Sequence, residues 1–145
     1  MTPKYKTLTA EQKAEIAELC KEIVKLSVQA RHEGLLALDE KISDAEAAFK
    51  EIPKSKKFFF VLLRLIVDGT NEDSLSIIVD NLLDSSADDD FEKLAFTLAK
   101  TGALAFQRGD NPFLVERLLL SILGFDAEEE ICAATGFKRW NESLW

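Results

Sequence analysis

Metal-binding and redox-active residues are scarce in this chain of 145 residues, which contains one histidine and two cysteines. Neither Cys20 nor Cys132 lies at a metal-ligand spacing from His32, so the pattern of a zinc site is missing. Two isolated cysteines in amphipathic segments are typical of thiols in a reducing compartment, with a single disulfide as the alternative. We therefore expect no metal site and a cytoplasmic protein.

Long hydrophobic runs are also absent. The most apolar segment, residues 58–67, is interrupted by Arg64 and has about half the length that a membrane-spanning helix needs. The N-terminal residues 1–6 are polar and lack the apolar core of a signal peptide. The sequence therefore predicts neither export nor membrane insertion.

Basic residues are outnumbered, with 18 Lys and Arg against 26 Asp and Glu, which gives a net charge of −8. Nucleic acids and anionic lipids carry the same sign of charge, so long-range attraction to them is not expected. A chain of this length can bury a sufficient core without disulfides or metals. We predict one domain over residues 1–145 that does not bind nucleic acid.

Short segments of alternating apolar and polar residues, which would predict a sheet, are lacking, and the apolar residues recur at helical spacing instead. Capping patterns support this interpretation: Thr9 precedes Gln12 by three residues, Asn71 precedes two acids, and Asn111 precedes Pro112. The sequence predicts an all-α, compact bundle of about six to eight helices. The first helix is expected to begin near residue 10 and to break near Gly34. Further helices are expected at 44–50, 57–67, 71–83, 91–106 and 112–123, and after 127. The helix at 57–67 should be central, and residues 84–90 should form a solvated connection.

Catalytic patterns are missing too. The helical serines have no histidine base nearby, no glycine-rich loop follows a strand, and the acidic run at 88–90 lacks the alternating ligands of a calcium loop. We expect no catalytic residue, no cofactor and no enzymatic activity. An enzyme with a pocket built from dispersed carboxylates remains the alternative class.

Three segments carry a family resemblance. Residues 30–39, Ala-Arg-His-Glu-Gly-Leu-Leu-Ala-Leu-Asp, resemble the pattern Ala-Arg-x-x-Gly-Leu-x-x-Leu-Glu that follows the membrane helices of MotA flagellar stator subunits. Residues 67–71, Val-Asp-Gly-Thr-Asn, resemble that family's Val-Asp-Gly-Thr-Asp. Residues 102–112 and 118–123 resemble its C-terminal cytoplasmic segment. The chain is thus similar to the cytoplasmic part of the MotA/TolQ/ExbB-like family, without the transmembrane helices.

The resemblance implies a helical fold and a charged contact with another protein. In the stators an arginine and an acid face the rotor switch protein, and the matching positions here are Arg31 and Asp39, where Asp replaces the usual Glu. Both could project from one side of a helix. The alternative is that Arg31 pairs within the domain and Asp39 is simply exposed. Because the membrane helices are missing, the stator's ion conduction is not implied.

Two functions follow as hypotheses. The first is a soluble, non-enzymatic protein–protein interaction module, an accessory or regulatory component of the flagellar motor, with the rotor switch protein or another motor component as its partner. The second is a structural scaffold that forms homo-oligomers or docks on other proteins through an aromatic tail at residues 125–145. The candidate anchors in that tail are Phe137, Trp140 and Trp145.

Overall fold

The computed structural model describes residues 2–140, and throughout this range the secondary structure is helical, with seven α-helices and no strand. The prediction of an all-α bundle of six to eight helices is confirmed. In chain order the elements are η1 (Tyr5–Thr7), α1 (Ala10–Glu33), η2 (Leu35–Leu38), α2 (Asp39–Ala47), α3 (Lys54–Val67), α4 (Glu72–Ser86), α5 (Asp90–Arg108), α6 (Pro112–Leu123), η3 (Phe125–Ala127) and α7 (Glu128–Thr135).

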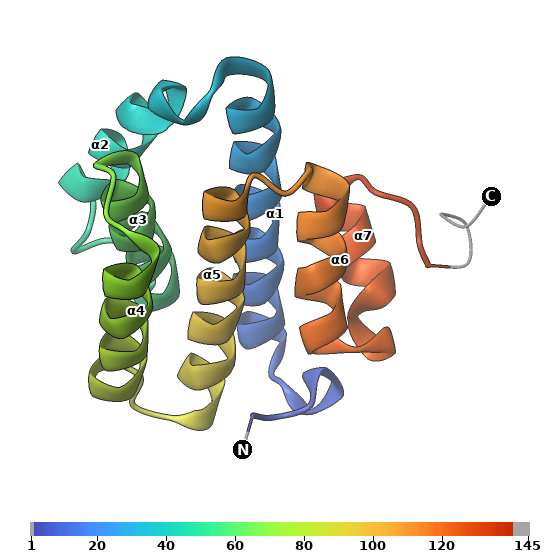
Figure 1. The fold of residues 1–145 in the computed structure, drawn as a ribbon. Coiled ribbons are helices and arrows are strands. Elements are labelled where there is room, and N and C mark those ends of the chain that lie inside the picture. Colours follow the sequence, from blue (N-terminus) through green and yellow to red (C-terminus); the bar gives the residue numbers. More distant parts are fainter. Residues whose placement is uncertain (1, 141–145) are drawn as a thin grey trace.

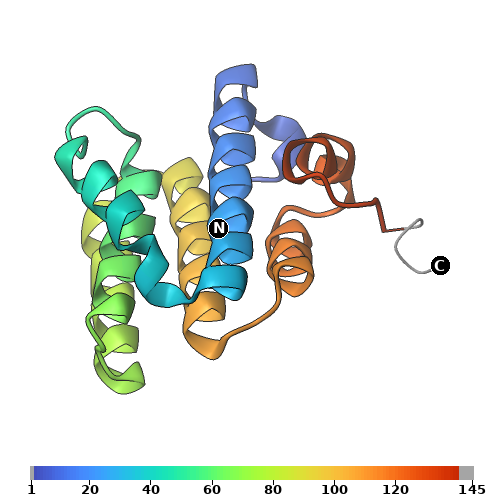
Figure 2. The same ribbon diagram turned by 90° about the horizontal axis from the view of Figure 1, so that it is seen from above.

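The helices form three groups side by side, which both ribbon views show (Figures 1 and 2). The helices α1 and α5 lie in the middle, α2, α3 and α4 on one side, and α6 and α7 on the other. The apolar helix α3 was predicted to be central, but it lies in a flanking group. It is nevertheless well buried, because α2, α4 and α5 all pack against it.

Close helix contacts are made where ring stacking or a small residue permits them. Phe58 of α3 stacks on Phe96 of α5, with ring centroids 4.7 Å apart. Gly102 of α5 faces Ile23 of α1 so closely that a Cβ atom there would lie 2.7 Å from Ile23 Cγ2. The small residue therefore sets the separation of the two central helices.

Most helix ends follow the predicted capping chemistry. Thr9 and Gln12 form a complete capping box, and the side chains of Asn71 and Asn111 accept backbone N–H groups at the starts of α4 and α6. Gly69, with φ of 85°, ends α3: its N–H donates to Ile66, and the Thr70 N–H donates to Leu65. These ends were predictable because the signals are local.

Three predicted boundaries were wrong. The helix expected at 44–50 begins at Asp39, because Gly34 and the single turn η2 lead directly into it. The helix expected from 57 begins at Lys54, immediately after Pro53. The connection expected at 84–90 is reduced to residues 87–89, because residues 84–86 continue α4 and the Asp89 carboxylate caps α5.

The junction between α4 and α5 is held by one lysine. Lys54 Nζ lies 3.0 Å from the Ser86 carbonyl oxygen, 2.7 Å from Asp88 Oδ2 and 2.9 Å from Glu92 Oε1. The start of α3 is thus joined to the end of α4 and the first turn of α5.

Among residues 2–140, no helix has the length and hydropathy to cross a bilayer.

Candidate functional site

A cavity lies where the last turns of α1 and α5 face each other. Its volume is about 500 Å³. The α1 side contributes Ser27, Ala30 and Arg31, which share one helix face because they are three and four residues apart. The other lining residues are Leu35, Phe106, Gln107, Arg108, Gly109 and Asp110. Two of the three segments that carry the family resemblance, residues 30–39 and 102–112, therefore meet in one cavity.

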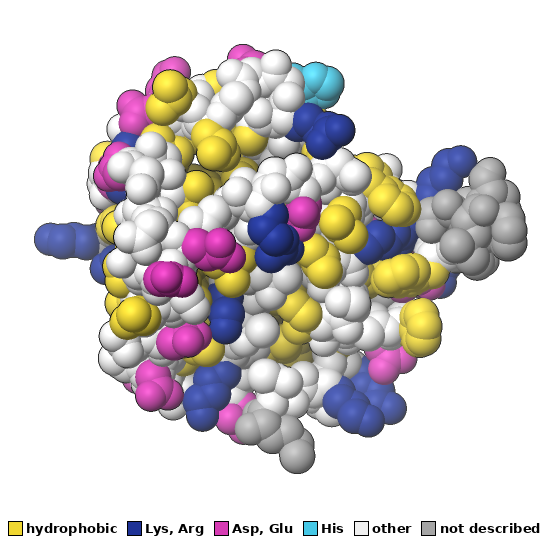
Figure 3. Space-filling model, in the orientation of Figure 1, with side chains coloured by type: hydrophobic (Ala, Val, Ile, Leu, Met, Phe, Trp, Pro, Cys, Tyr) yellow, Lys and Arg dark blue, Asp and Glu magenta, His cyan; other side chains and the backbone are white. Residues whose placement is uncertain are grey.

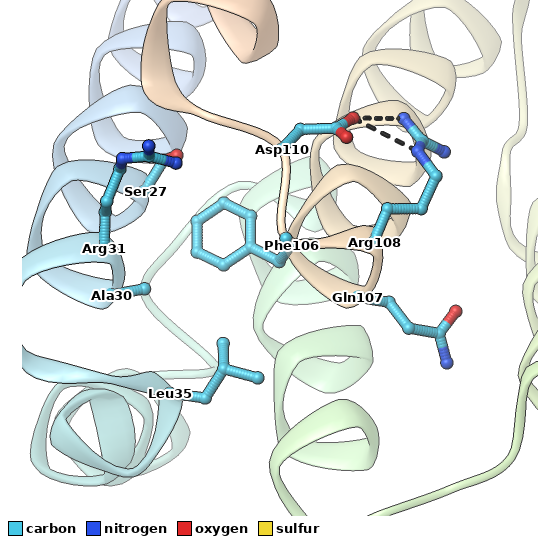
Figure 4. A pocket seen from close by; sticks show the side chains of 9 residues that line it. Ser27, Ala30, Arg31, Leu35, Phe106, Gln107, Arg108 and Asp110 are labelled. Carbon is cyan, nitrogen blue, oxygen red and sulfur yellow. Dashed lines mark hydrogen bonds and ion pairs between the residues drawn. The ribbon is translucent and has the colours of Figure 1, made fainter.

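The turn between α5 and α6 builds one wall of the cavity. Gly109 has a φ of 77°, and its N–H donates to the Phe106 carbonyl, which reverses the chain at the end of α5. Arg108 points to Asp110 across this turn, with Nη2 and Nε lying 2.7 Å and 3.1 Å from Asp110 Oδ2 (Figure 4). The charges of this pair compensate each other.

Arg31 is the unpaired charge of the cavity. It is exposed at the end of α1, and it forms no ion pair or hydrogen bond with any residue of the described part of the chain. Its side chain and that of Ser27 lie on the α1 side, with the Phe106 ring between them and the Arg108–Asp110 pair (Figure 4). The expected exposure of Arg31 is therefore present, and the alternative that it pairs within the domain does not apply to residues 2–140.

Asp39 does not share a helix face with Arg31. Gly34, with φ of 88°, ends α1 between them, and η2 separates α1 from α2. The Asp39 carboxylate lies 2.6 Å from Nη1 of Arg64, which also donates two hydrogen bonds to Glu46. The hydrogen bonds from Arg64 hold the pKa of Glu46 below its ordinary value. The prediction that Arg31 and Asp39 project together from one helix is wrong, because the chain turns at Gly34.

The predicted aromatic anchors in the described part of the tail pack on their own domain. Phe137 meets Phe113 edge to face, with ring centroids 5.9 Å apart. The Trp140 ring lies over the Arg117 guanidinium, 4.7 Å from centroid to Cζ, and its backbone N–H donates to Glu128 Oε2 at 2.5 Å. Both aromatic side chains are half-buried. Trp145 lies outside the described residues.

A buried charged pair beneath this tail was not predicted. Glu116 is 0% exposed and Arg117 is 7% exposed, and Arg117 Nε lies 3.5 Å from Glu116 Oε1. The guanidinium lies between the rings of Phe113 and Trp140 and donates to the Lys138 carbonyl. The carboxylate accepts weak hydrogen bonds from Thr135 Oγ1 at 3.4 Å and Cys132 Sγ at 3.6 Å.

Burial controls the ionisation of this cluster. Desolvation raises the pKa of Glu116, although the neighbouring Arg117 opposes the shift. Desolvation likewise raises the pKa of Cys132 to about 11 and that of Cys20 to about 12, each helped by the Glu116 charge. Both thiols are buried and unbonded to each other, so they remain protonated at neutral pH and are weak nucleophiles.

The position of Glu116 in the sequence indicates that this charged residue is buried. Glu116 precedes Leu119, Leu120 and Leu123 by three, four and seven residues, which is the spacing of one helix face. A charge on such a stripe indicates burial. For the cavity, the spacing of Ser27, Ala30 and Arg31 is a signal that the prediction did not use, and nothing in the sequence indicates that Phe106 and Asp110 face these residues.

No protein-family model, curated protein or solved structure matched this chain in the comparisons that we made. The likeness to the MotA family therefore depends on the three segments themselves. Within residues 2–140, no group of three or more His, Cys, Asp and Glu side chains is arranged to hold a metal ion. The arrangement that offers a contact to another molecule is the cavity with the unpaired guanidinium of Arg31.

Proposed function

We propose that this chain is a non-enzymatic protein-binding module of the cytoplasm, an accessory or regulatory component of the flagellar motor. The observation that supports the proposal is the exposed, unpaired guanidinium of Arg31, at the position where the resembling stators present an arginine to their partner. Charge complementarity across an interface steers encounter and sets its orientation. The partner should therefore present an acidic surface, as the rotor switch protein does in the resembling family.

The contact that we propose uses fewer charged residues than the one in the stators. Asp39 is paired with Arg64 in the junction between α2 and α3, so it contributes little to an outside partner. Arg31 therefore carries the charge recognition without Asp39 as its acidic counterpart. A reversal of charge at Arg31 should accordingly weaken binding strongly, whereas neutralisation of Asp39 should change it little.

The test is a binding measurement between the purified chain and the C-terminal domain of the flagellar switch protein, at low and moderate salt. We expect salt-sensitive binding that weakens at least about tenfold in Arg31→Glu. Lys25→Glu is the matched control, because Lys25 is also exposed on α1 and lies outside the cavity lining. Equal binding of both variants, or no binding by the parent chain, would refute the proposal.

The second candidate is a scaffold that associates with further copies of itself. Phe125 is 81% exposed beside a hollow of about 280 Å³ that Leu120, Ser121 and Gly124 line together with Trp140. Hydrophobic side chains also gather over α6 on the face that Figure 3 shows. Since Phe137 and Trp140 pack on their own domain, the anchor of such a contact would be Phe125.

Sedimentation velocity over a range of concentrations tests this scaffold function. Association that is lost in Phe125→Ser would favour it over the motor function. A monomer at every concentration would eliminate it. Because Phe125 and Arg31 lie on different elements, the two candidate functions can fail independently.

A further inference from the structure

The cavity between α1 and α5 is lined by a serine whose hydroxyl has no hydrogen-bond partner among the described residues. Ser27 is 5% exposed and lines the cavity, and its hydroxyl forms no hydrogen bond with residues 2–140. Its oxygen is not one of the fully buried side-chain atoms that lack a partner, so the hydroxyl is open to the cavity and available to a ligand. Arg31, one helical turn later on the same face of α1, provides an unpaired guanidinium next to it.

The remaining walls favour a ligand with an apolar body. Phe106 is almost fully buried and presents its ring between α1 and the turn after α5, with Ala30 and Leu35 beside it (Figure 4). The Gln107 amide points away from Arg31. A concave site lined by apolar side chains, with a few polar groups that fix orientation, is typical of small-molecule sites, and about 500 Å³ is within their usual size.

The charged residues that line the cavity favour a ligand with a single negative charge. Arg108 and Asp110 compensate each other, so Arg31 leaves one net positive charge in a chain whose net charge is −8. One uncompensated guanidinium is matched by one carboxylate, because the planar fork of arginine binds two carboxylate oxygens at once. A polyanion would meet Asp110 without a second free cation to balance it.

We propose that this cavity binds a small monocarboxylate with an apolar body, whose carboxylate pairs with Arg31 and accepts a hydrogen bond from the Ser27 hydroxyl, while its apolar part lies on Phe106 and Leu35. The inference goes beyond the proposed function, because its ligand is a free small molecule and not a protein. Occupancy of the cavity would compete with any protein partner that uses Arg31.

Protein-observed NMR titration of the full chain tests the inference, with phenylacetate as the probe and phenylacetamide as its uncharged counterpart. So small a ligand is expected to bind in the millimolar range. We expect phenylacetate to shift the backbone amide signals of Ser27, Phe106 and Gly109, and phenylacetamide to bind more weakly by about tenfold. No shift of these signals by phenylacetate, or equal binding of acid and amide, would overturn the proposal.

Variants locate the binding site. Arg31→Gln should weaken phenylacetate binding about tenfold, whereas the charge-matched control Lys25→Gln should leave it unchanged. Asp110→Asn frees Arg108 on the opposite wall and should tighten binding. Each substitution is at a residue that is exposed or half-buried, and an unchanged thermal unfolding midpoint confirms that the fold is intact. An Arg31→Gln affinity equal to that of the parent would overturn the proposal.

The two functional tests remain separable. The switch-protein measurement contains no small carboxylate, and the titration contains no protein partner. Phenylacetate binding without switch-protein binding would support this inference and refute the motor function. The reverse outcome would overturn this inference and leave the motor function supported.

Discussion

The substitution Arg117→Met tests how the buried charged pair under the C-terminal tail contributes to stability. It removes the cation from between the Phe113 and Trp140 rings and leaves Glu116 buried without its counter-charge. Breaking one side of a buried ion pair costs about 3–5 kcal/mol. Arg117 Nε and Nη1 make no hydrogen bond within residues 2–140, so their removal relieves about 1–3 kcal/mol of unmet desolvation. We therefore expect a net loss of about 2 kcal/mol near neutral pH.

The loss should depend on pH, and the sign follows from Glu116. Because burial raises its folded pKa, Glu116 contributes stability that is present below its ordinary pKa and is lost as pH rises through the raised value. Without Arg117 to oppose it, this rise should be larger. The cost of Arg117→Met should thus be greater at about pH 7 than at about pH 5, because the lower pH favours the protonated, uncharged form of Glu116.

Urea unfolding at both pH values measures the effect. The double variant Glu116→Gln, Arg117→Met removes both charges and should recover most of the loss, with little dependence on pH in this range. Arg139→Met is the matched control, since Arg139 is half-exposed and its 3.4 Å pair with Glu128 should be worth less than about 1 kcal/mol. Equal losses at both pH values, or a double variant as unstable as the single one, would refute this reasoning.

Two glycine substitutions test the backbone and the packing. Gly34→Ala should lower the free energy of unfolding, measured in urea, by about 1–3 kcal/mol. The new Cβ has open space around it, so the loss would come from the φ of 88° alone. An unchanged free energy of unfolding would show that the turn tolerates a side chain. Gly102→Ala should lose about 1–3 kcal/mol by overpacking against Ile23, partly offset by about 1 kcal/mol of helix propensity. In an Ile23→Ala background the additional loss caused by Gly102→Ala should disappear, so the double variant should be as stable as Ile23→Ala alone. A double variant that is less stable than Ile23→Ala would exclude the clash as the cause.

Local patterns accounted for most of the helices. Thr9, Asn71 and Asn111 were correctly predicted as caps because each acts on backbone groups two or three residues away. The acidic run was misjudged for the same local reason: Asp89 is both a solvated residue and a good N-cap, and its composition does not distinguish the two. The position of α3 was misjudged because an apolar circumference indicates burial without saying which helices provide it.

Some features of the candidate site also follow from local sequence patterns, and others do not. Arg31 was predicted to face a partner, and it is exposed; its spacing from Ser27 and Ala30, which the prediction did not use, places these residues on one face of α1. The pairing of Asp39 with Arg64, 25 residues later, could not be derived from either segment. Whether a surface charge remains available to a partner depends on which side chains the fold brings within reach.

The sequence by itself determined that the chain is helical, where most helices begin and end, and which residues line each apolar stripe, because these properties follow from interactions within a few residues. Only the tertiary structure decided that Arg31 and Phe106 share a cavity, that Arg64 takes up Asp39, and that Arg117 is buried beneath Trp140. These contacts join segments distant in the chain, and their geometry depends on how whole helices pack. No periodicity within one segment encodes that packing.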